Sequence, residues 1–162
     1  MGVEIERKFL VIGTAWKSEY GTAQQEHLPF GRNLSQGYLS QNQQVTVRVR
    51  IDEAQGFLTV KGPTEGFRRA EFEYEIPLDD ARELLELCRP RLIEKRRYVL
   101  EFGGHCWEID EFMGENAGLV IAEIELPSED TTFARPAWLG QEVSTDPRYR
   151  NSNLVSHPFQ SW

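Results

Sequence analysis

Hydrophobic and polar residues alternate along most of this chain with a period of two, as they do in β-strands, where successive side chains point to opposite faces. The alternation holds in residues 3–10, 34–40, 45–51, 57–61, 69–76, 94–101, 106–112 and 119–126. Gly62-Pro63 is expected to end one of these strands, and Gly103-Gly104 is typical of a β-hairpin turn. Because short turns favour antiparallel pairing, the pattern predicts a mainly β protein of the α+β class.

One stretch has the 3.6-residue period of an amphipathic helix, and it begins after Pro77. Asp79 is the expected N-cap, and Pro90 is expected to end the helix. The apolar stripe of this helix consists of Ala81, Leu84, Leu85 and Cys88. Beyond Pro127 the two-residue period is lost, and residues 133–141 are expected to be helical.

The polar faces of the predicted strands carry charges where an ordinary surface sheet would mix in serine, threonine and amides. The acids on these faces are Glu4, Glu6, Glu71, Glu73, Glu75, Glu108, Asp110, Glu123 and Glu125. The bases are Lys8, Arg48, Arg50, Lys61, Arg69, Lys95 and Arg97. One interpretation is an open sheet with one wet face. The other is a closed barrel with the charges inside, where they are too costly unless they hold a metal ion and an anion. Periodicity leaves both open.

The first strand illustrates the chemistry that such a face can support. Glu4 and Glu6 lie about 6.5–7 Å apart along a strand, so both carboxylates can reach one hard cation, which takes oxygen ligands. Lys8, one step further, can meet the anion that the cation brings with it. The alternative is an amphipathic strand whose charged face lies in water.

Length and charge limit the classes of protein to which the chain can belong. Its 162 residues fit one domain, residues 1–162, with a core of ordinary size. The formal net charge of -8 argues against nucleic acid or a membrane surface as the main partner. Cys88 and Cys106 lack metal-type spacing and are expected to be reduced thiols. Without an N-terminal apolar segment, the protein is expected to be cytoplasmic.

The charged motifs, taken in order, resemble the CYTH superfamily of triphosphate tunnel metalloenzymes. The opening Glu4-x-Glu6-x-Lys8 matches the ExExK signature of that family. The later motifs are Arg48-x-Arg50, Thr59-x-Lys61, Arg69-x-Glu71-x-Glu73, Glu94-Lys95-x-Arg97-Tyr98, Glu108-x-Asp110 and Glu123-x-Glu125. The tail from Gly140 to Asn151 resembles the ending of short bacterial members. A single ExExK motif is weak evidence, whereas the ordered series covers nearly the whole chain.

The resemblance implies a single CYTH domain folded as a closed eight-stranded antiparallel β-barrel, a tunnel with a few flanking helices. It implies Mg²⁺ or Mn²⁺ as the cofactor, a choice that suits an all-oxygen site. The candidate metal ligands are Glu4, Glu6, Asp110, Glu123 and Glu125. The candidate substrate-binding residues are Lys8, Arg48, Arg50, Lys61, Arg69, Lys95 and Arg97. For each acid the alternative to metal binding is a salt bridge inside the barrel. The two roles are equally plausible for Glu71, Glu73 and Glu108, and the salt bridge is favoured for Glu75.

Lys8, Tyr38 and Lys95 are the candidate catalytic residues. Lys8 and Tyr38 are expected to act near the attacking water, because a lysine desolvated among other cations has a lowered pKa. A partly neutral Lys8 could accept a proton or hold Tyr38 as the acceptor. The competing interpretation makes Lys8 one more phosphate clamp and Tyr38 a packing residue.

The predicted reaction is metal-dependent hydrolysis of a triphosphate, with inorganic triphosphate cleaved to pyrophosphate and phosphate. The same scaffold also hosts thiamine triphosphatases, RNA 5'-triphosphatases and class IV adenylate cyclases, so the fold does not settle the substrate. The HARF-type motif that we associate with the cyclases is absent, and the CHAD domain of longer members is not expected. The alternative of another class is a non-catalytic polyphosphate or nucleotide sensor. The expected partner is a small-molecule triphosphate, and a homodimer is left open.

Overall fold

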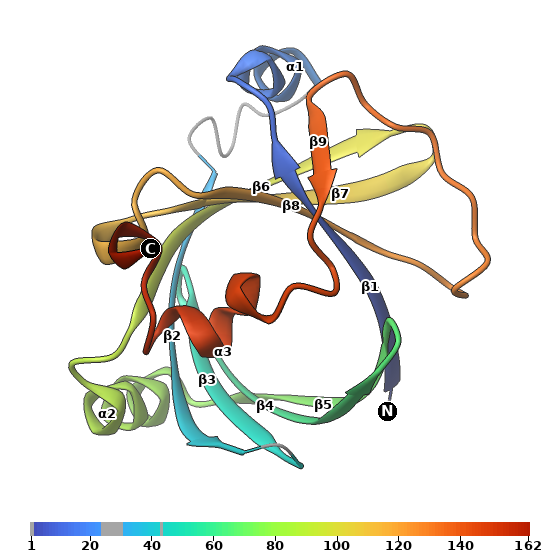
Figure 1. Cartoon of the computed structure of the whole chain (residues 1–162). Helices are drawn as coiled ribbons and strands as arrows, with labels where there is room; N and C mark the ends of the chain where they lie inside the picture. The colour runs from blue at the N-terminus through green and yellow to red at the C-terminus, as the bar shows by residue number, and fades with distance from the viewer. Residues whose placement is uncertain (1, 24–30, 43) are drawn as a thin grey trace.

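Eight antiparallel strands close into a barrel in the computed structural model of the chain, which describes residues 2–23, 31–42 and 44–162 (Figure 1). The barrel strands are β1 (Gly2–Val11), β2 (Arg32–Gln41), β3 (Thr46–Asp52), β4 (Gln55–Glu65), β5 (Arg68–Ile76), β6 (Ile93–Phe102), β7 (His105–Phe112) and β8 (Val120–Glu125). The α-helices are α1 (Ala15–Ala23), α2 (Leu78–Cys88) and α3 (Asn151–Leu154). Short 3₁₀ helices cover Gly114–Asn116, Pro147–Tyr149 and Phe159–Ser161. None of the described helices is long and apolar enough to cross a membrane.

Closure depends on β1, the strand that meets both ends of the sheet. The strands follow the order β5-β4-β3-β2-β6-β7-β8-β1, and β1 then pairs with β5. Residues Glu6 to Leu10 of β1 pair with β8, whereas Gly2 to Ile5 pair with β5. The prediction of a closed antiparallel barrel is therefore confirmed, and the open sheet with one wet face is excluded.

A ninth strand, β9 (Leu139–Glu142), corrects the prediction of a helix over residues 133–141. It adds to the edge of β1 beyond the point where β5 diverges, with Val11 opposite Leu139. Four residues are too few to show a period, so only the free edge of β1 reveals the strand.

The strand that was expected to end at Gly62-Pro63 continues to Glu65. Its pairing with β5 shifts register between Lys61 and Thr64, as a β-bulge does, and this accommodates a proline that cannot donate a ladder hydrogen bond.

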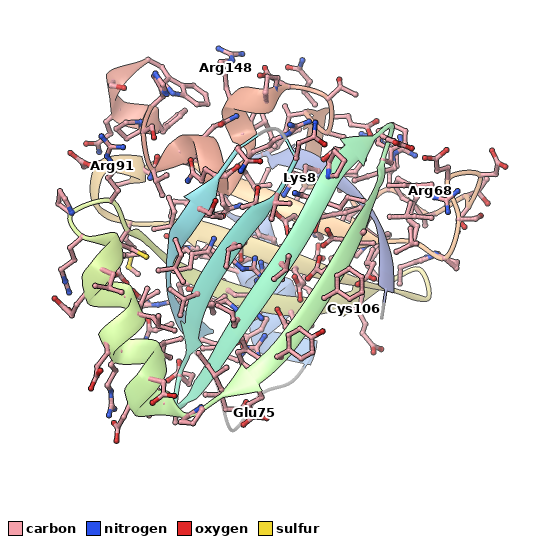
Figure 2. The ribbon with its side chains drawn as sticks, turned by 90° about the horizontal axis from the view of Figure 1, so that it is seen from below. Lys8, Arg68, Glu75, Arg91, Cys106 and Arg148 are labelled. Atoms are coloured by element: carbon pink, nitrogen blue, oxygen red, sulfur yellow. The ribbon has the colours of Figure 1, made fainter. Side chains whose placement is uncertain are left out.

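The outer face of the barrel is apolar, and two elements cover part of it. Buried Trp16 and Tyr20 of α1 join the core on the outside of β1, β6, β7 and β8, together with Trp138 and Leu139. The second cover, α2, packs on the outside of β2, β3 and β4 through Ala81, Leu85 and Cys88 (Figure 2). The main hydrophobic cores therefore lie outside the barrel wall, which leaves the inner face free for charges.

The start of α2 differs from the prediction that Asp79 is its N-cap. Pro77 occupies the cap position, and no side chain accepts a hydrogen bond there. Asp79 lies in the first turn instead, where a negative charge interacts favourably with the helix dipole.

The chain beyond β9 returns across the barrel opening (Figure 1). Leu154 of α3 is buried against the inward-facing Ile93, Phe112 and Ile121 of three strands. This apolar cluster closes one part of the barrel interior, so the remaining interior is the charged part.

Candidate active site

A cavity of about 640 Å³ occupies the barrel interior and takes side chains from all eight barrel strands. Among the described residues, eight lysines and arginines and seven glutamates line it. The lining is thus close to neutral in a chain whose formal net charge is -8. Cations gathered in this way can accept a polyanion that the rest of the surface would repel.

The structure brings nearly all the predicted site residues together in this cavity. The predicted substrate-binding residues that line it are Lys8, Arg48, Arg50, Lys61, Arg69, Lys95 and Arg97. The predicted metal ligands that line it are Glu4, Glu6, Glu123 and Glu125. Tyr38 lines it as well, together with Glu71, Glu73 and Glu108. Glu75, for which a salt bridge was favoured, does not line it and is exposed, with no ion pair to any described residue.

Asp110 was predicted to bind metal, but the structure does not place it in the cavity lining. It is 0% exposed, and both carboxylate oxygens are occupied. Lys95 Nζ donates to it at 2.6 Å, while Arg97 Nε and Nη2 donate at 2.7 and 2.8 Å. Burial raises the pKa of Asp110, but Arg97 and Lys95 outweigh burial and hold it below its ordinary value. Asp110 therefore anchors two cavity cations, and we remove it from the candidate metal ligands.

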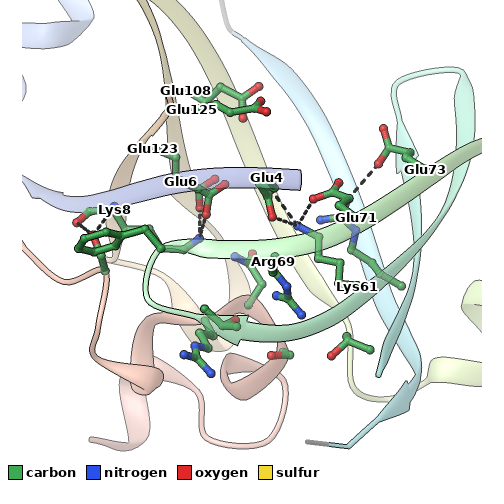
Figure 3. A pocket seen from close by; sticks show the side chains of 18 of the residues that line it. Glu4, Glu6, Lys8, Lys61, Arg69, Glu71, Glu73, Glu108, Glu123 and Glu125 are labelled. Carbon is green, nitrogen blue, oxygen red and sulfur yellow. Dashed lines mark hydrogen bonds and ion pairs between the residues drawn. The ribbon is translucent and has the colours of Figure 1, made fainter. Parts of the chain in front are cut away.

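The acidic part of the cavity is formed by β1, β7 and β8 (Figure 3). Burial raises the pKa of Glu6, and the neighbouring Glu123 adds to the effect. Burial also raises the pKa of Glu125, with further contributions from Glu4 and Glu6. Burial likewise raises the pKa of Glu108; Arg97 opposes the effect, and Glu123 and Asp110 add to it. Carboxylates that crowd one another in this way are stabilised by a cation, and their oxygens suit a hard divalent ion.

The acids are held by lysines in this arrangement. Lys8 Nζ lies 2.8 Å from Glu6 and 2.6 Å from Glu123. Lys61 lies between Glu4, at 3.0 Å, and Glu71, at 2.8 Å (Figure 3). Among the described residues, no group of three or more acidic, histidine or cysteine side chains is arranged to hold a metal ion. A metal ion held by these carboxylates would take the place of their lysine partners.

Lys8 has the opposite protonation behaviour to the one predicted from the sequence. Burial alone lowers its pKa, but Glu123 and Glu6 raise it far above the ordinary value. While it is paired with these two carboxylates, Lys8 is therefore fully protonated, which contradicts the prediction of a partly neutral Lys8. Lys95 is the lysine whose pKa is lowered, to about 8, because burial and the nearby Arg97 outweigh the attraction of Asp110.

The basic part of the cavity lies on β3 and β4. Arg48 and Arg50 share one carboxylate, that of Glu73, at 3.2 and 3.4 Å. Thr59 donates to the same carboxylate at 2.8 Å. The Nε atoms of Arg48 and Arg50 are buried and have no hydrogen-bond partner among the described residues. These guanidinium groups therefore keep donors available for the oxygens of an anion.

The C-terminal segment contributes residues that the sequence analysis did not select. The lining includes Ser144, Arg150, Asn151 and Ser152. Asn151 Oδ1 accepts hydrogen bonds from Lys95 Nζ at 3.1 Å and from Gln36 Nε2 at 3.3 Å. Gln36 Nε2 also donates to the Tyr38 hydroxyl at 3.2 Å. The tail motif contains Ser144 and Asn151, but without strand alternation nothing in the sequence indicates that they point into the barrel.

Fold and site together define a class of protein: a closed β-barrel whose tunnel pairs a carboxylate cluster with a set of lysines and arginines. Such an arrangement is suited to a linear polyanion together with a hard cation. The chain belongs to the CYTH domain family, whose model matches residues 2–156.

Two curated relatives extend over nearly the full chain. An inorganic triphosphatase of Acetivibrio thermocellus is 51% identical, and the match covers 100% of this chain and 99% of that protein. An inorganic triphosphatase of Nitrosomonas europaea is 34% identical, with coverage of 94% and 96%.

Solved structures agree with the fold. The crystal structure of an inorganic triphosphatase matches with a TM-score of 0.65 and 32% identity, covering 96% of this chain and 95% of the other. A protein from Pyrococcus furiosus matches with a TM-score of 0.57 at 20% identity, a likeness that concerns the fold alone.

Proposed function

We propose that this protein hydrolyses inorganic triphosphate to pyrophosphate and phosphate with the help of a divalent cation. The observation that carries the proposal is one cavity inside the barrel in which seven carboxylates and eight cations meet. Both full-length relatives are inorganic triphosphatases, which supports the same substrate here. Apolar side chains in the lining are few, with Phe67, Leu126 and Pro127 at its edge, so the cavity favours bare phosphate over a nucleoside or thiamine group.

The carboxylates that would hold the cation are Glu4, Glu6, Glu123 and Glu125. Their crowding, expressed in the raised pKa of Glu4, Glu6 and Glu125, fits a Mg²⁺ or Mn²⁺ site. When bound, such an ion neutralises and polarises the phosphoryl group under attack.

The remaining catalytic work is positioning and charge neutralisation, as in phosphoryl transfer generally. Arg48, Arg50 and Arg97 would bind phosphate oxygens with their forked donors. Lys8 and Lys61 would act as point charges, each exchanging a carboxylate partner for a phosphate oxygen. We therefore assign Lys8 to substrate binding and not to proton transfer.

We assign Tyr38 to orienting a reactant and not to taking its proton. Burial raises the pKa of Tyr38 even though Arg48 and Lys61 oppose the effect, so its hydroxyl stays protonated near neutral pH. In this state it can donate a hydrogen bond to a phosphate oxygen or to water. Lys95, with a pKa of about 8, stays the candidate proton carrier among the catalytic residues.

Phosphate release from a panel of substrates tests the proposal: inorganic triphosphate, ATP and thiamine triphosphate, each with and without Mg²⁺ or Mn²⁺. Inorganic triphosphate should give the highest kcat/KM, and release should require the cation. Preference for thiamine triphosphate, or cyclic AMP formed from ATP, would assign a different reaction. Tight triphosphate binding without release under all conditions would favour the polyphosphate sensor.

Glu4→Gln tests the metal assignment, because it keeps the size of the side chain and removes one charge. We expect the cation concentration for half-maximal rate to rise by roughly tenfold, the loss of one charge-assisted contact. Glu65→Gln on the exposed end of β4 is the matched control and should leave the cation dependence unchanged. Full activity of the wild type in excess chelator would contradict the assignment.

The cytoplasmic location stays a prediction from the sequence. A homodimer would use the outer barrel wall, where Val3, Phe72 and Tyr74 are 55%, 37% and 58% exposed. Sedimentation of the wild type and of Tyr74→Glu would detect such an assembly, because a new charge in an apolar interface opposes association.

A further inference from the structure

A second cavity of about 310 Å³ adjoins the main one where the C-terminal segment meets β3, β4 and β5. The two cavities share five lining residues: Thr46, Thr64, Arg69, Arg150 and Ser152. Because the same side chains face both spaces, the interior continues from the main cavity past the C-terminal segment.

Two arginines at this junction differ from every other cation of the main cavity. The other lining cations all have an acidic partner within 4.0 Å: Lys8, Arg48, Arg50, Lys61, Lys95 and Arg97. Arg69 instead donates to the Gly62 carbonyl, at 2.8 Å from Nη2 and 3.2 Å from Nε, and makes no ion pair with a described residue. The guanidinium group of Arg150 makes neither a hydrogen bond nor an ion pair with any described residue, although its backbone pairs with Pro147, Asn153 and Leu154.

The two guanidinium groups also repel each other. Burial lowers the pKa of Arg69; Glu4 opposes that effect, and the charge of Arg150 adds to it. Like charges brought together at low dielectric are unfavourable, and Glu4 offsets only part of the effect on Arg69. An anion that contacts both groups would stabilise the pair, and two guanidinium forks suit the oxygens of a phosphate.

We propose that Arg69 and Arg150 form an additional phosphate subsite at the junction of the two cavities, with Thr64 and Ser152 as neutral hydroxyl donors. The inference rests on the proposed function and deepens it. The ligand is a phosphate group from one of two sources. It is either the fourth phosphoryl group of a linear polyphosphate longer than triphosphate, or free phosphate released by hydrolysis.

The test compares the wild type with Arg150→Met and with the control Arg148→Met. Arg148 lies on the outside of the same segment, 61% exposed and paired with Asp146 at 2.8 Å (Figure 2). We measure kcat/KM for inorganic triphosphate and tetraphosphate, and inhibition of triphosphate hydrolysis by added phosphate. Arg150→Lys keeps the charge and should recover part of any loss.

If a fourth phosphoryl group binds at the subsite, Arg150→Met should lower kcat/KM roughly tenfold more for tetraphosphate than for triphosphate. If released phosphate binds at the subsite instead, Arg150→Met should change kcat/KM equally for both substrates and should make inhibition by phosphate roughly tenfold weaker. Arg148→Met should show neither effect.

Equal losses on both substrates with unchanged phosphate inhibition would overturn the subsite, as would behaviour identical to that of Arg148→Met. Calorimetric titration of tetraphosphate and of phosphate into the same proteins gives this comparison without turnover. If the wild type did not hydrolyse triphosphate, the proposed function would fail, while the titration would still decide whether Arg150 binds phosphate.

Discussion

At the scale of single residues, the site depends on how buried charges are paired. Asp110 shows this most clearly, because one carboxylate with no exposed surface binds both Lys95 and Arg97. Bringing three charges out of water is costly, and only complete pairing offsets the cost. The pairing holds two cavity cations in fixed positions, which is the kind of preorganisation that an anion site requires.

Asp110→Asn should therefore destabilise the fold, because the buried Lys95 loses its acidic partner and the buried Arg97 keeps only Glu108 and the more distant Glu123. We expect the free energy of unfolding to fall by about 3–5 kcal/mol. Asp146→Asn is the matched control: this carboxylate pairs with the exposed Arg148, so its loss should cost at most about 1 kcal/mol. Urea unfolding of both variants measures the difference. Similar midpoints for the two variants would show that Asp110 is not the anchor described above.

At the scale of elements, α2 approaches the barrel closely at two glycines of the wall. A Cβ at Gly37 of β2 would lie 2.5 Å from Cβ of Cys88, and a Cβ at Gly56 of β4 would lie 2.6 Å from Cβ of Ala81. Both glycines thus provide space that lets the apolar stripe of α2 reach the outer face. The helix in turn covers the outside of β2 and β3, whose inner faces carry Tyr38, Arg48 and Arg50.

Gly37→Ala should push α2 away from the wall and lower the free energy of unfolding by about 1–3 kcal/mol, the usual cost of overpacking. Gly62→Ala on β4 is the control, since its Cβ would meet Ala70 at an ordinary 3.4 Å. Thermal unfolding of both variants provides the measurement. An unchanged melting temperature for Gly37→Ala would mean that α2 can shift without loss.

At the scale of the whole molecule, the barrel wall separates the apolar cores from the charged cavity. Its main apolar cores lie outside the wall, under α1, α2 and the segment that leads to β9, and its charges lie inside. Most charges of the interior are paired with one another, so an incoming polyanion must replace carboxylates that already hold the lysines. Binding is therefore an exchange of partners within the barrel cavity.

Inorganic triphosphate should stabilise the folded protein even in the presence of a metal chelator, because it binds the tunnel cations of the folded state alone. At a hundredfold excess over the dissociation constant the gain is about 2.7 kcal/mol, which corresponds to a rise in Tm of roughly 5–10 °C. Sodium sulfate at equal ionic strength is the control for general salt effects. A shift no larger than that given by sulfate would argue against a tunnel that recognises linear phosphate.

The sequence by itself determined the properties that repeat locally along the chain. A period of two fixed the strands and the face on which Glu4, Lys8, Arg48 and Lys61 lie, because side-chain direction in a strand depends only on parity. The same local reasoning located α2. The ordered charge motifs indicated the family, since each motif occupies one strand.

Only the tertiary structure decided what depends on distant partners. Closure requires β1 to pair with β5 and β8 together, and the four residues of β9 form a strand only because β1 offers a free edge. The role of Asp110 and the protonation of Lys8 depend on neighbours from other strands, which set the balance between burial and charge. Parity gives the direction of a side chain but not its partner, and partners decide both pKa and function.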